Sequence, residues 1–195
     1  MKVIAITGGI GSGKSYVSNF FSELKIPIYD SDSRAKFLMN NNKTIIKKVV
    51  ESLGSQSYKN GQTDKSYISK SIFQNSNNLK LLNSIIHPAV LKDFNNWLSL
   101  QTSRYVIYES ALIFNNQYQN RFDSVILVLS SDENRITRLK KRGLSLNMIK
   151  RIMKVQLSNP EMIALSNFII KNNNSTDIKA EVLNLHKLFS SQENK

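Results

Sequence analysis

The sequence of 195 residues predicts an α/β fold in which a five-stranded parallel sheet is flanked by helices. Apolar runs rich in Val, Ile, Tyr and Phe alternate along the chain with amphipathic stretches, which is the pattern of strand–helix–strand units. Most of these runs are apolar throughout, as expected of parallel strands that are covered on both faces. In addition, a glycine-rich loop joins the first apolar run to the first amphipathic stretch.

The predicted strands occupy five short segments, at 2–7, 26–30, 104–110, 123–130 and 167–172. Amphipathic stretches predict helices at 14–24, 33–53, 76–101, 132–156 and 177–190, with a break in the fourth at Gly143. No internal repeat or linker divides the chain, so we expect a single domain over 1–195. The long helix-rich gap between the second and third strands predicts a cap beside the sheet.

The chain is strongly basic, with 27 Lys and Arg against 14 acidic residues and a formal net charge of +13. Such a charge attracts anions, whether nucleic acid, a membrane surface or phosphorylated metabolites. The basic residues are spread along the chain, however, so a solvated basic surface explains them equally well. The charge alone therefore names no partner.

Cysteine is absent, which excludes disulfides and thiolate metal sites and makes a reducing cytoplasm the expected location. No stretch approaches the roughly 20 apolar residues that span a bilayer. The N-terminal run VIAI is also too short for a signal peptide. We therefore expect no association with a membrane.

The run GGIGSGKS fits the pattern G-x-x-x-x-G-K-[ST] and stands between a predicted strand and a predicted helix. Glycines let successive backbone N–H groups point at phosphate oxygens, and the following helix directs its positive dipole end at the same place. Lys14 would reach the β- and γ-phosphates, and the Ser15 hydroxyl would coordinate Mg²⁺. This pattern predicts a P-loop nucleoside triphosphate site, whose nucleotide-binding residues are Gly9, Ile10, Gly11, Ser12, Gly13, Lys14, Ser15 and Tyr16.

Three classes of P-loop protein compete for this sequence. A GTPase needs an Asn-Lys-x-Asp motif, which NKTI at 42–45 imitates with Ile45 in place of the carboxylate. An ATPase that acts on nucleic acid or protein usually has an Asp-Glu pair at a strand end, whereas the best acidic strand end here is Glu109, without that pair. A small-molecule kinase needs an acceptor pocket, a base and a mobile basic lid.

The second predicted strand ends in YDSDS, at the same sheet edge as the glycine loop. One of Asp30 and Asp32 would therefore accept a hydroxyl proton or hold the metal through water. Helix capping is the alternative, since Asp30, Ser31, Asp32 and Ser33 are all good N-caps for the helix that follows.

The most basic segment lies at 133–156, in two helical patterns broken at Gly143. A helix–glycine–helix of this charge is typical of a lid that closes over a triphosphate, excludes water and supplies arginine to the transferred group. Arg142, at the break, is the predicted catalytic arginine. Most of the other basic residues, Arg135 among them, are expected on solvated helix faces.

Five motifs, in this order and spacing, resemble the dephospho-CoA kinase family: ITGGIGSGKS, YDSDSRAK, SIIHPAV, YESALIF, and RLKKRGLS followed by Gln156. The resemblance covers essentially the whole chain and implies a fold similar to that of nucleotide kinases. It implies a core at about 1–32, 102–131 and 157–195, a helical acceptor-binding cap at about 33–101 and a basic lid at about 132–156.

The resemblance also implies a reaction. Members of the family transfer the γ-phosphate of ATP to the ribose 3′-hydroxyl of dephospho-CoA, in the last step of coenzyme A biosynthesis. ATP and dephospho-CoA are then the expected partners and Mg²⁺ the expected metal, with neither nucleic acid nor a membrane involved. The oligomeric state is not implied.

Residue by residue, the resemblance makes Asp32 the base at the 3′-hydroxyl and places His87 and Pro88 in the acceptor pocket. Glu109, in the YESALIF motif, is predicted to bind substrate as well. Without the resemblance, His87-Pro88 equally well punctuates two helices, because proline suits a first helical turn. The predicted catalytic residues are Asp32, Lys14 and Arg142.

The sequence departs from the family pattern at four positions. Asn115 replaces a carboxylate, Met162 replaces a common Lys or Arg, and Ser166-Asn167 replaces Ala-Asp. These departures leave the catalytic residues intact but affect the contacts expected at the adenine and at the lid hinge. The alternatives are another small-molecule or nucleotide kinase, or a nucleic-acid-associated P-loop ATPase.

Overall fold

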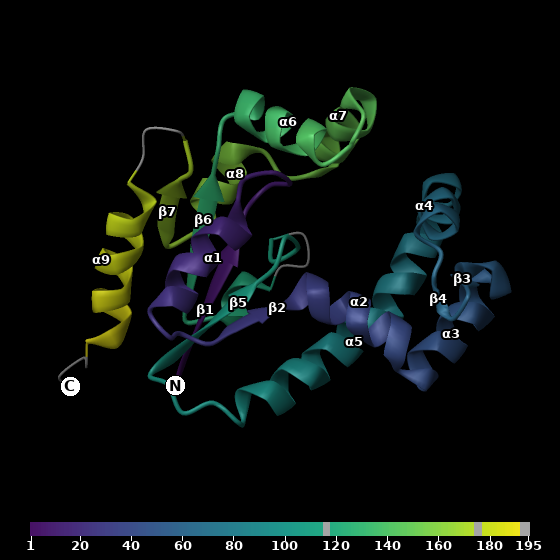
Figure 1. The fold of residues 1–195 in the computed structure, drawn as a ribbon, viewed down its shortest axis with the longest axis horizontal. Coiled ribbons are helices and arrows are strands. Elements are labelled where there is room, and N and C mark those ends of the chain that lie inside the picture. Colours follow the sequence, from purple (N-terminus) through teal and green to yellow (C-terminus); the bar gives the residue numbers. More distant parts are fainter. Residues whose placement is uncertain (115–117, 174–176, 192–195) are drawn as a thin grey trace. The chain divides into compact units, whose positions relative to one another are not determined.

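The computed structural model describes residues 1–114, 118–173 and 177–191. The chain divides into two compact units, of which unit 1 comprises Met1–Asp30 and Gln101–Lys195 and unit 2 comprises Ser31–Leu100. Figure 1 shows the elements of both units in the order of the chain. Each unit has its own buried side chains and is described by itself.

Unit 1 is built on a five-stranded parallel sheet with the order β2-β5-β1-β6-β7 (Figure 1). The strands are β1 (Lys2–Thr7), β2 (Ile28–Asp30), β5 (Tyr105–Glu109), β6 (Ser124–Leu129) and β7 (Phe168–Lys171). The predicted α/β fold is therefore confirmed, and each of the five predicted segments holds a strand. Because every pairing is parallel, all the carboxyl ends lie at one edge of the sheet.

Helices cover both faces of this sheet, as the continuously apolar strands predict. On one face, α1 (Lys14–Glu23) and α9 (Ile178–Ser190) contribute side chains to the cluster that covers β1, β5 and β6. On the other face, α8 (Asn159–Ala164) packs together with Ile113 and Phe114. Residues 4–6 of the central strand β1 are consequently fully buried.

Tyr105 of β5 links α9 to the sheet. Its fully buried ring makes edge contacts with Phe21 of α1 and Phe189 of α9. Its hydroxyl oxygen lies 2.8 Å from Nδ1 of His186 in α9. Burial raises the pKa of this hydroxyl, so it stays protonated at neutral pH.

Unit 1 also holds the basic segment, as two helices. α6 (Asp132–Lys141) and α7 (Leu146–Val155) confirm the break predicted at Gly143, whose φ is +84°. A short 3-10 turn, η2 (Gln119–Arg121), precedes β6.

Unit 2 is mainly helical, with α2 (Ser31–Asn41), α3 (Lys43–Leu53), α4 (Lys65–Gln74) and α5 (Ser76–Leu98). Between α3 and α4 lie the 3-10 turn η1 (Ser55–Ser57) and the strands β3 (Tyr58–Lys59) and β4 (Gln62–Thr63). The guanidinium of Arg34 in α2 donates to both carboxylate oxygens of Asp93 in α5, at 2.6 and 2.8 Å. This bidentate ion pair ties the first helix of the unit to the last.

The segment predicted as one helix at 33–53 is in fact two helices, because Asn42 ends the first and caps the second. Its side chain accepts hydrogen bonds from the N–H groups of Thr44 and Ile45, at 3.0 and 3.2 Å. The run that imitates a GTPase motif is therefore a helix N-cap.

The elements that lie outside the predicted helices and strands include the β3–β4 hairpin, α4 and α8. The hairpin turns at Asn60-Gly61, where φ is positive at both residues, and this dipeptide is typical of such turns. α8 begins with a capping box formed by Ser158 and Glu161. Both signals are local and can be read from the sequence.

Pro88 lies inside α5, so the alternative that His87-Pro88 punctuates two helices is wrong. Proline lacks an N–H group, and the helix continues through it without one backbone hydrogen bond. Although α5 spans 23 residues, neither it nor any other described helix is long and apolar enough to cross a membrane.

We expect Tyr105→Phe to lower the free energy of unfolding by about 1 kcal/mol, because it deletes the hydrogen bond to His186 in a buried setting. For a protein of this size that corresponds to a fall in Tm of about 2–4 °C, measurable by thermal unfolding. Tyr16→Phe is the matched control, since Tyr16 is 54% exposed and its hydroxyl has access to water. Equal Tm values for Tyr105→Phe and the unchanged protein would contradict the assignment.

Candidate active site

The glycine loop, residues 8–13, connects β1 to α1 at the carboxyl edge of the parallel sheet. Glu109, the last residue of the neighbouring β5, is the register partner of Asp30 at the end of β2. On the other side of β1, α6 follows β6, and Asn172 comes directly after β7. The topology thus delivers polar residues from several strands to the edge that carries the loop.

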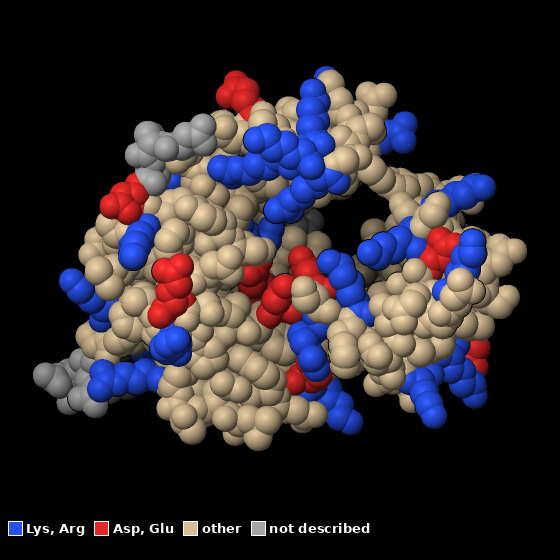
Figure 2. Space-filling model, viewed as in Figure 1, with Lys and Arg blue, Asp and Glu red and all other residues tan. Residues whose placement is uncertain are grey.

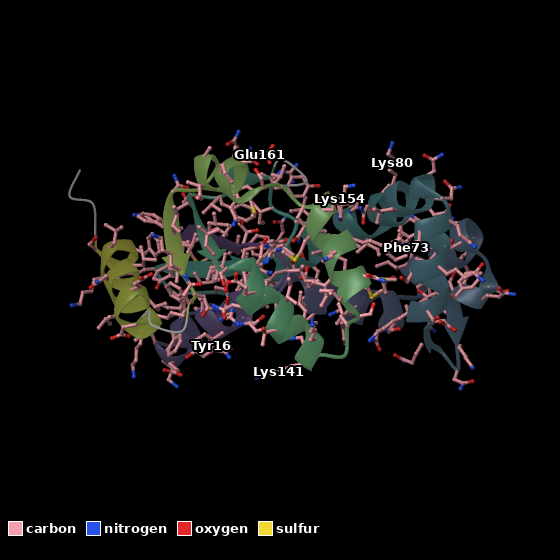
Figure 3. All side chains as sticks on the ribbon, turned by 90° about the horizontal axis from the view of Figure 1, so that it is seen from above. Tyr16, Phe73, Lys80, Lys141, Lys154 and Glu161 are labelled. Atoms are coloured by element: carbon pink, nitrogen blue, oxygen red, sulfur yellow. The ribbon has the colours of Figure 1, made fainter. Side chains whose placement is uncertain are left out.

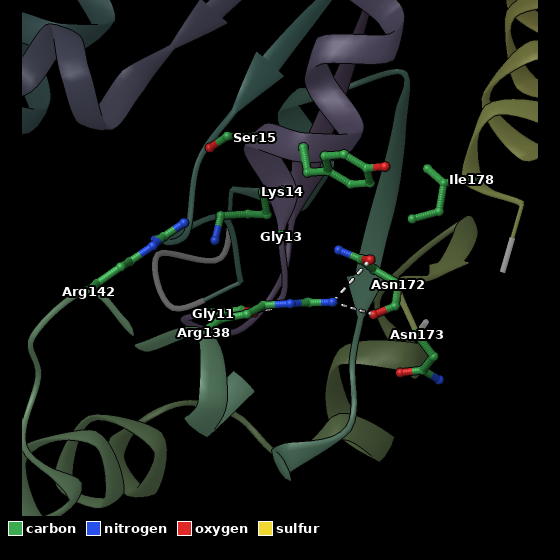
Figure 4. A pocket seen from close by; sticks show the side chains of 10 residues that line it. Gly11, Gly13, Lys14, Ser15, Arg138, Arg142, Asn172, Asn173 and Ile178 are labelled. Carbon is green, nitrogen blue, oxygen red and sulfur yellow. Dashed lines mark hydrogen bonds between the residues drawn. The ribbon is translucent and has the colours of Figure 1, made fainter. Parts of the chain in front are cut away.

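A pocket of about 540 Å³ opens over this loop. Its lining residues come from the loop and the start of α1, from α6 and its C-cap, from the chain that follows β7, and from the first residue of α9 (Figure 4). All of them belong to unit 1. The lining residues are Gly11, Gly13, Lys14, Ser15, Tyr16, Arg138, Arg142, Asn172, Asn173 and Ile178.

The amino terminus of α1 lies at this pocket. Gly13 is its N-cap, in the left-handed conformation (φ 93°, ψ 32°), and no described side chain caps the helix. The first N–H groups of a helix have no partner within the helix and carry the positive end of its dipole. Together with the left-handed Gly11 (φ +77°), this backbone provides inward N–H groups suited to an anion.

Lys14 and Ser15 follow the loop and have partners within it or beside it. Nζ of Lys14 donates to the carbonyl of Gly8 at 3.2 Å. Oγ of Ser15 donates to Oε1 of Glu109 at 2.7 Å. A buried carboxylate is therefore joined to a hydroxyl that lines the pocket.

Asn172 and Arg138 hold the outer side of the loop. Nδ2 of Asn172 donates to the carbonyl of Ser12 at 2.8 Å. Nη1 of Arg138 donates to the carbonyls of Gly11 and Ser12, at 3.3 and 3.1 Å, and its Nη2 donates to Asn172 (Figure 4). A Cβ at Gly13 would collide with Nδ2 of Asn172, so this close support requires glycine.

The expectation that Arg135 lies on a solvated helix face is wrong. Arg135 is only 6% exposed, and its Nε donates to the carbonyl of Ile10 at 2.9 Å. Its Nη2 donates to Oε1 of Gln156, and its Nη1 pairs with Asp132, both at 3.1 Å. The physical reason is the space left by Gly9, where a Cβ would lie 2.5 Å from Nη2 of Arg135.

Arg142, the C-cap of α6, lines the pocket, as its predicted role requires. Other basic side chains of this region are exposed, and Figure 2 shows lysine and arginine gathered over α6 and α7. Figure 3 labels two of them, Lys141 and Lys154. These exposed residues are Lys140, Lys141, Lys150, Arg151 and Lys154.

Three of the predicted acceptor-side residues, Asp32, His87 and Pro88, belong to unit 2. Asp32 lies in the first turn of α2, where a carboxylate interacts favourably with the helix dipole. His87 is partly buried in α5, and this burial lowers its pKa and favours the neutral ring. Pro88 is exposed on the same helix.

Of the four departures from the family pattern, Asn115 lies outside the described residues. Met162 is buried in the apolar cluster between α8 and the sheet. Oδ1 of Asn167 accepts from the N–H of Val125 at 2.8 Å, and Oγ of Ser166 donates to a carbonyl of α8 at 3.0 Å. The three described residues thus stabilise the sheet and α8.

Four pocket residues were not predicted as site residues: Arg138, Asn172, Asn173 and Ile178. Two signals point to them in the sequence. The asparagines directly follow the last strand, at the edge already used for the other strands. Arg138 recurs with Arg135 and Arg142 at a spacing of three and four residues, which places them on one helix face. Ile178 carries no such signal.

A strand, a glycine loop and an uncapped helix at the edge of a five-stranded parallel sheet define a P-loop protein that binds nucleoside triphosphates. The family model described as dephospho-CoA kinase matches residues 2–177. The chain therefore belongs to the dephospho-CoA kinase family, and its function is that of an ATP-dependent kinase in coenzyme A biosynthesis.

Two relatives agree with this membership, and a solved structure shares the fold. The dephospho-CoA kinase of Fusobacterium nucleatum is 30% identical over 177 residues, covering 90% of this chain and 91% of its own. That of Porphyromonas gingivalis is 40% identical over 142 residues, covering 73% and 70%. A crystal structure from Thermus thermophilus matches the fold with a TM-score of 0.86 at 24% identity, covering 98% of both chains.

We expect Gly13→Ala to weaken ATP binding by at least about 10-fold, because its Cβ would displace Asn172 and an L side chain at this φ costs about 1–2 kcal/mol. The measurement is a titration with ATP. The control is Gly61→Ala, at a similar φ of +75° in the hairpin of unit 2, with no described atom within 4 Å of its Cβ. Gly61→Ala should lower stability without changing ATP affinity, and equal affinities for both variants would contradict the role of Gly13.

Proposed function

We propose that this chain transfers the γ-phosphate of ATP to the ribose 3′-hydroxyl of dephospho-CoA. The observation that carries the proposal is the pocket of unit 1, in which an uncapped helix terminus, a lysine and two arginines surround one space. Such a set of donors suits a polyphosphate. Membership of the family supplies the acceptor.

ATP binding falls to residues 9–16. The N–H groups of Gly13 and of the first residues of α1 hold the phosphate oxygens, and Nζ of Lys14 leaves the carbonyl of Gly8 to contact them. Arg142, which lines the same pocket, neutralises charge that develops on the transferred group. Within the lid expected at 132–156, the residues after Arg142 serve as the part that closes.

The residues at the loop also fit Mg²⁺, which prefers oxygen ligands and is held at nucleotide sites by few protein groups together with phosphates. Ser15 would hold the ion, and Glu109, at 2.7 Å from the Ser15 hydroxyl, would orient that ligand. Glu109 is therefore assigned to the metal side, in place of the substrate contact expected from the sequence. When bound, Mg²⁺ neutralises phosphate charge and orients the triphosphate.

Unit 2 is proposed as the acceptor-binding cap. In the reaction the 3′-oxygen forms a bond to the γ-phosphorus, the bond to the bridging oxygen of ADP breaks, and Asp32 accepts the proton of the hydroxyl. His87 and Pro88, on α5, contribute to binding of dephospho-CoA. The absence of cysteine from the sequence suits the reducing cytoplasm, where we place the protein.

We expect purified protein to release ADP only when dephospho-CoA is present and to yield CoA phosphorylated at the 3′ position. The measurement is a coupled ADP assay with mass analysis of the product, run with a panel of alcohol acceptors, DNA and RNA. Lys14→Ala controls for a contaminating kinase and should lose turnover by orders of magnitude. ADP release stimulated by nucleic acid, without a 3′-phosphorylated product, would overturn the proposal.

We expect Asp32→Asn to lower turnover by about 10²–10⁴-fold, the span of general base catalysis, because an amide cannot accept the proton. Loss of the charge–dipole interaction in α2 should cost only about 0.3–1 kcal/mol of stability. Steady-state kinetics and thermal unfolding measure the two effects separately.

Two matched substitutions accompany this experiment. Asp64→Asn replaces the N-cap of α4 with an equally good cap and should leave turnover unchanged. Asp30→Asn should have a milder effect than Asp32→Asn, with partial recovery at raised Mg²⁺ concentration if Asp30 helps to hold the metal. Near-normal turnover of Asp32→Asn would show that its carboxylate only stabilises the helix.

A further inference from the structure

α6 packs directly beneath the glycine loop, where Gly9 and Gly11 present no side chain to it. A Cβ at Gly9 would meet three atoms of the Arg135 guanidinium group, the nearest at 2.5 Å. A Cβ at Gly11 would lie 3.0 Å from Cγ of Leu139, one turn further along α6. Arg135 and Leu139 are both buried, so this face of α6 is covered by the loop.

The peptide groups on either side of Ile10 are fixed by two side chains. The N–H of Ile10 donates to Oε1 of Gln156 at 3.0 Å, and the carbonyl of Ile10 accepts from Nε of Arg135 at 2.9 Å. Nη2 of Arg135 donates to the same oxygen of Gln156 at 3.1 Å. Three hydrogen bonds therefore form a closed triangle that joins the loop to α6 and to the C-cap of α7.

These bonds answer a requirement of any loop that cradles a phosphate. When successive N–H groups turn toward an anion, the carbonyls turn toward the protein, where each needs a donor if it is buried. The carbonyls of Ile10, Gly11 and Ser12 receive such donors from two arginines of α6, Arg135 and Arg138. Hydrogen bonds from a charged donor are stronger than neutral ones, so the arginines hold this conformation firmly.

We propose that Arg135 is a positioning residue that, together with Gln156, holds the glycine loop in its nucleotide-binding conformation before ATP arrives. The inference rests on the proposed function, because it assigns ATP to the loop. Arg135 is not among the described residues that line the pocket, and it acts on the nucleotide through Ile10. α6 is then a fixed support, and closure of the lid belongs to the residues after Arg142.

A residue that supports the glycine loop should affect the binding of ATP and leave the binding of dephospho-CoA unchanged. Loss of Arg135 lets the loop sample conformations that do not bind phosphate, which raises the KM and the dissociation constant for ATP. The KM for dephospho-CoA and the turnover at saturating ATP change little, because Arg135 touches no reacting atom. A role in stability alone would lower Tm and leave both KM values unchanged.

The first measurement is calorimetric titration of MgATP into the full chain without acceptor, well below the melting temperature. Arg135→Ala should raise the dissociation constant by about 10-fold to 100-fold, the cost of a lost charged hydrogen bond to a buried group. Lys140→Ala, which removes an exposed cation from the same helix, should change it by less than about twofold. Val182→Ala, on the buried face of α9, controls for lowered stability.

The second measurement is a double-mutant cycle between Gly9 and Arg135. Gly9→Ala should weaken MgATP binding in the unchanged protein, because its Cβ displaces the guanidinium group. In the Arg135→Ala background the atoms nearest to that Cβ are gone. There Gly9→Ala should raise the dissociation constant for MgATP by less than about twofold. Arg135→Lys should recover part of the affinity, since an ammonium can reach the carbonyl of Ile10 without also forking to Gln156.

Several results would overturn the inference. One is an unchanged dissociation constant for MgATP in Arg135→Ala, and another is a KM that rises equally for ATP and dephospho-CoA. A third is an effect of Gly9→Ala on the dissociation constant that is equally large with and without Arg135. If Arg135→Ala does not fold, Gln156→Ala removes the other half of the triangle and carries the same test. Failure of the proposed function is distinguishable, because the unchanged protein would then make no CoA from dephospho-CoA and ATP.

Discussion

The phosphate site depends on one constraint of backbone chemistry. A loop that presents its N–H groups to an anion must bury its carbonyls on the opposite side, and each of these needs a donor. Here the carbonyls of residues 10–12 are held by Arg135, Arg138 and Asn172. The glycines of the loop permit the turn and also leave room for these donors. A Cβ at position 9 or 13 would occupy the space of a supporting side chain.

The parallel sheet brings these supports together. β1 leads into the loop, β6 leads into the helix that carries both arginines, and β7 leads into Asn172. On the other side of β1, β5 ends in Glu109, which accepts a hydrogen bond from Ser15. Segments far apart in the sequence meet because parallel strands end at a common edge. The sheet that forms the core of unit 1 therefore also positions its site.

The sequence was sufficient for the strands, the glycine loop and the break at Gly143, because each has a local signal. It was insufficient for Arg135: helical periodicity groups residues on a face but does not say whether water or a glycine loop covers that face. Asn42, inside the helix predicted at 33–53, is instead the N-cap of α3, because periodicity does not mark where one helix ends and the next begins. The catalytic role of Asp32 and the acceptor-binding role of His87 rest on resemblance to the family, since in unit 2 both occupy ordinary helical positions.

The central claim is that the glycine loop is built for phosphate before the nucleotide arrives. Crystal structures of the protein alone and with Mg²⁺ and a non-hydrolysable ATP analogue test it most directly. The account predicts that the backbone of residues 8–15 superposes within about 1 Å, that the bonds from Arg135 and Asn172 persist, and that phosphate oxygens accept from the N–H groups of Gly13, Lys14 and Ser15. A loop that refolds on binding, or a triphosphate held elsewhere, would contradict it.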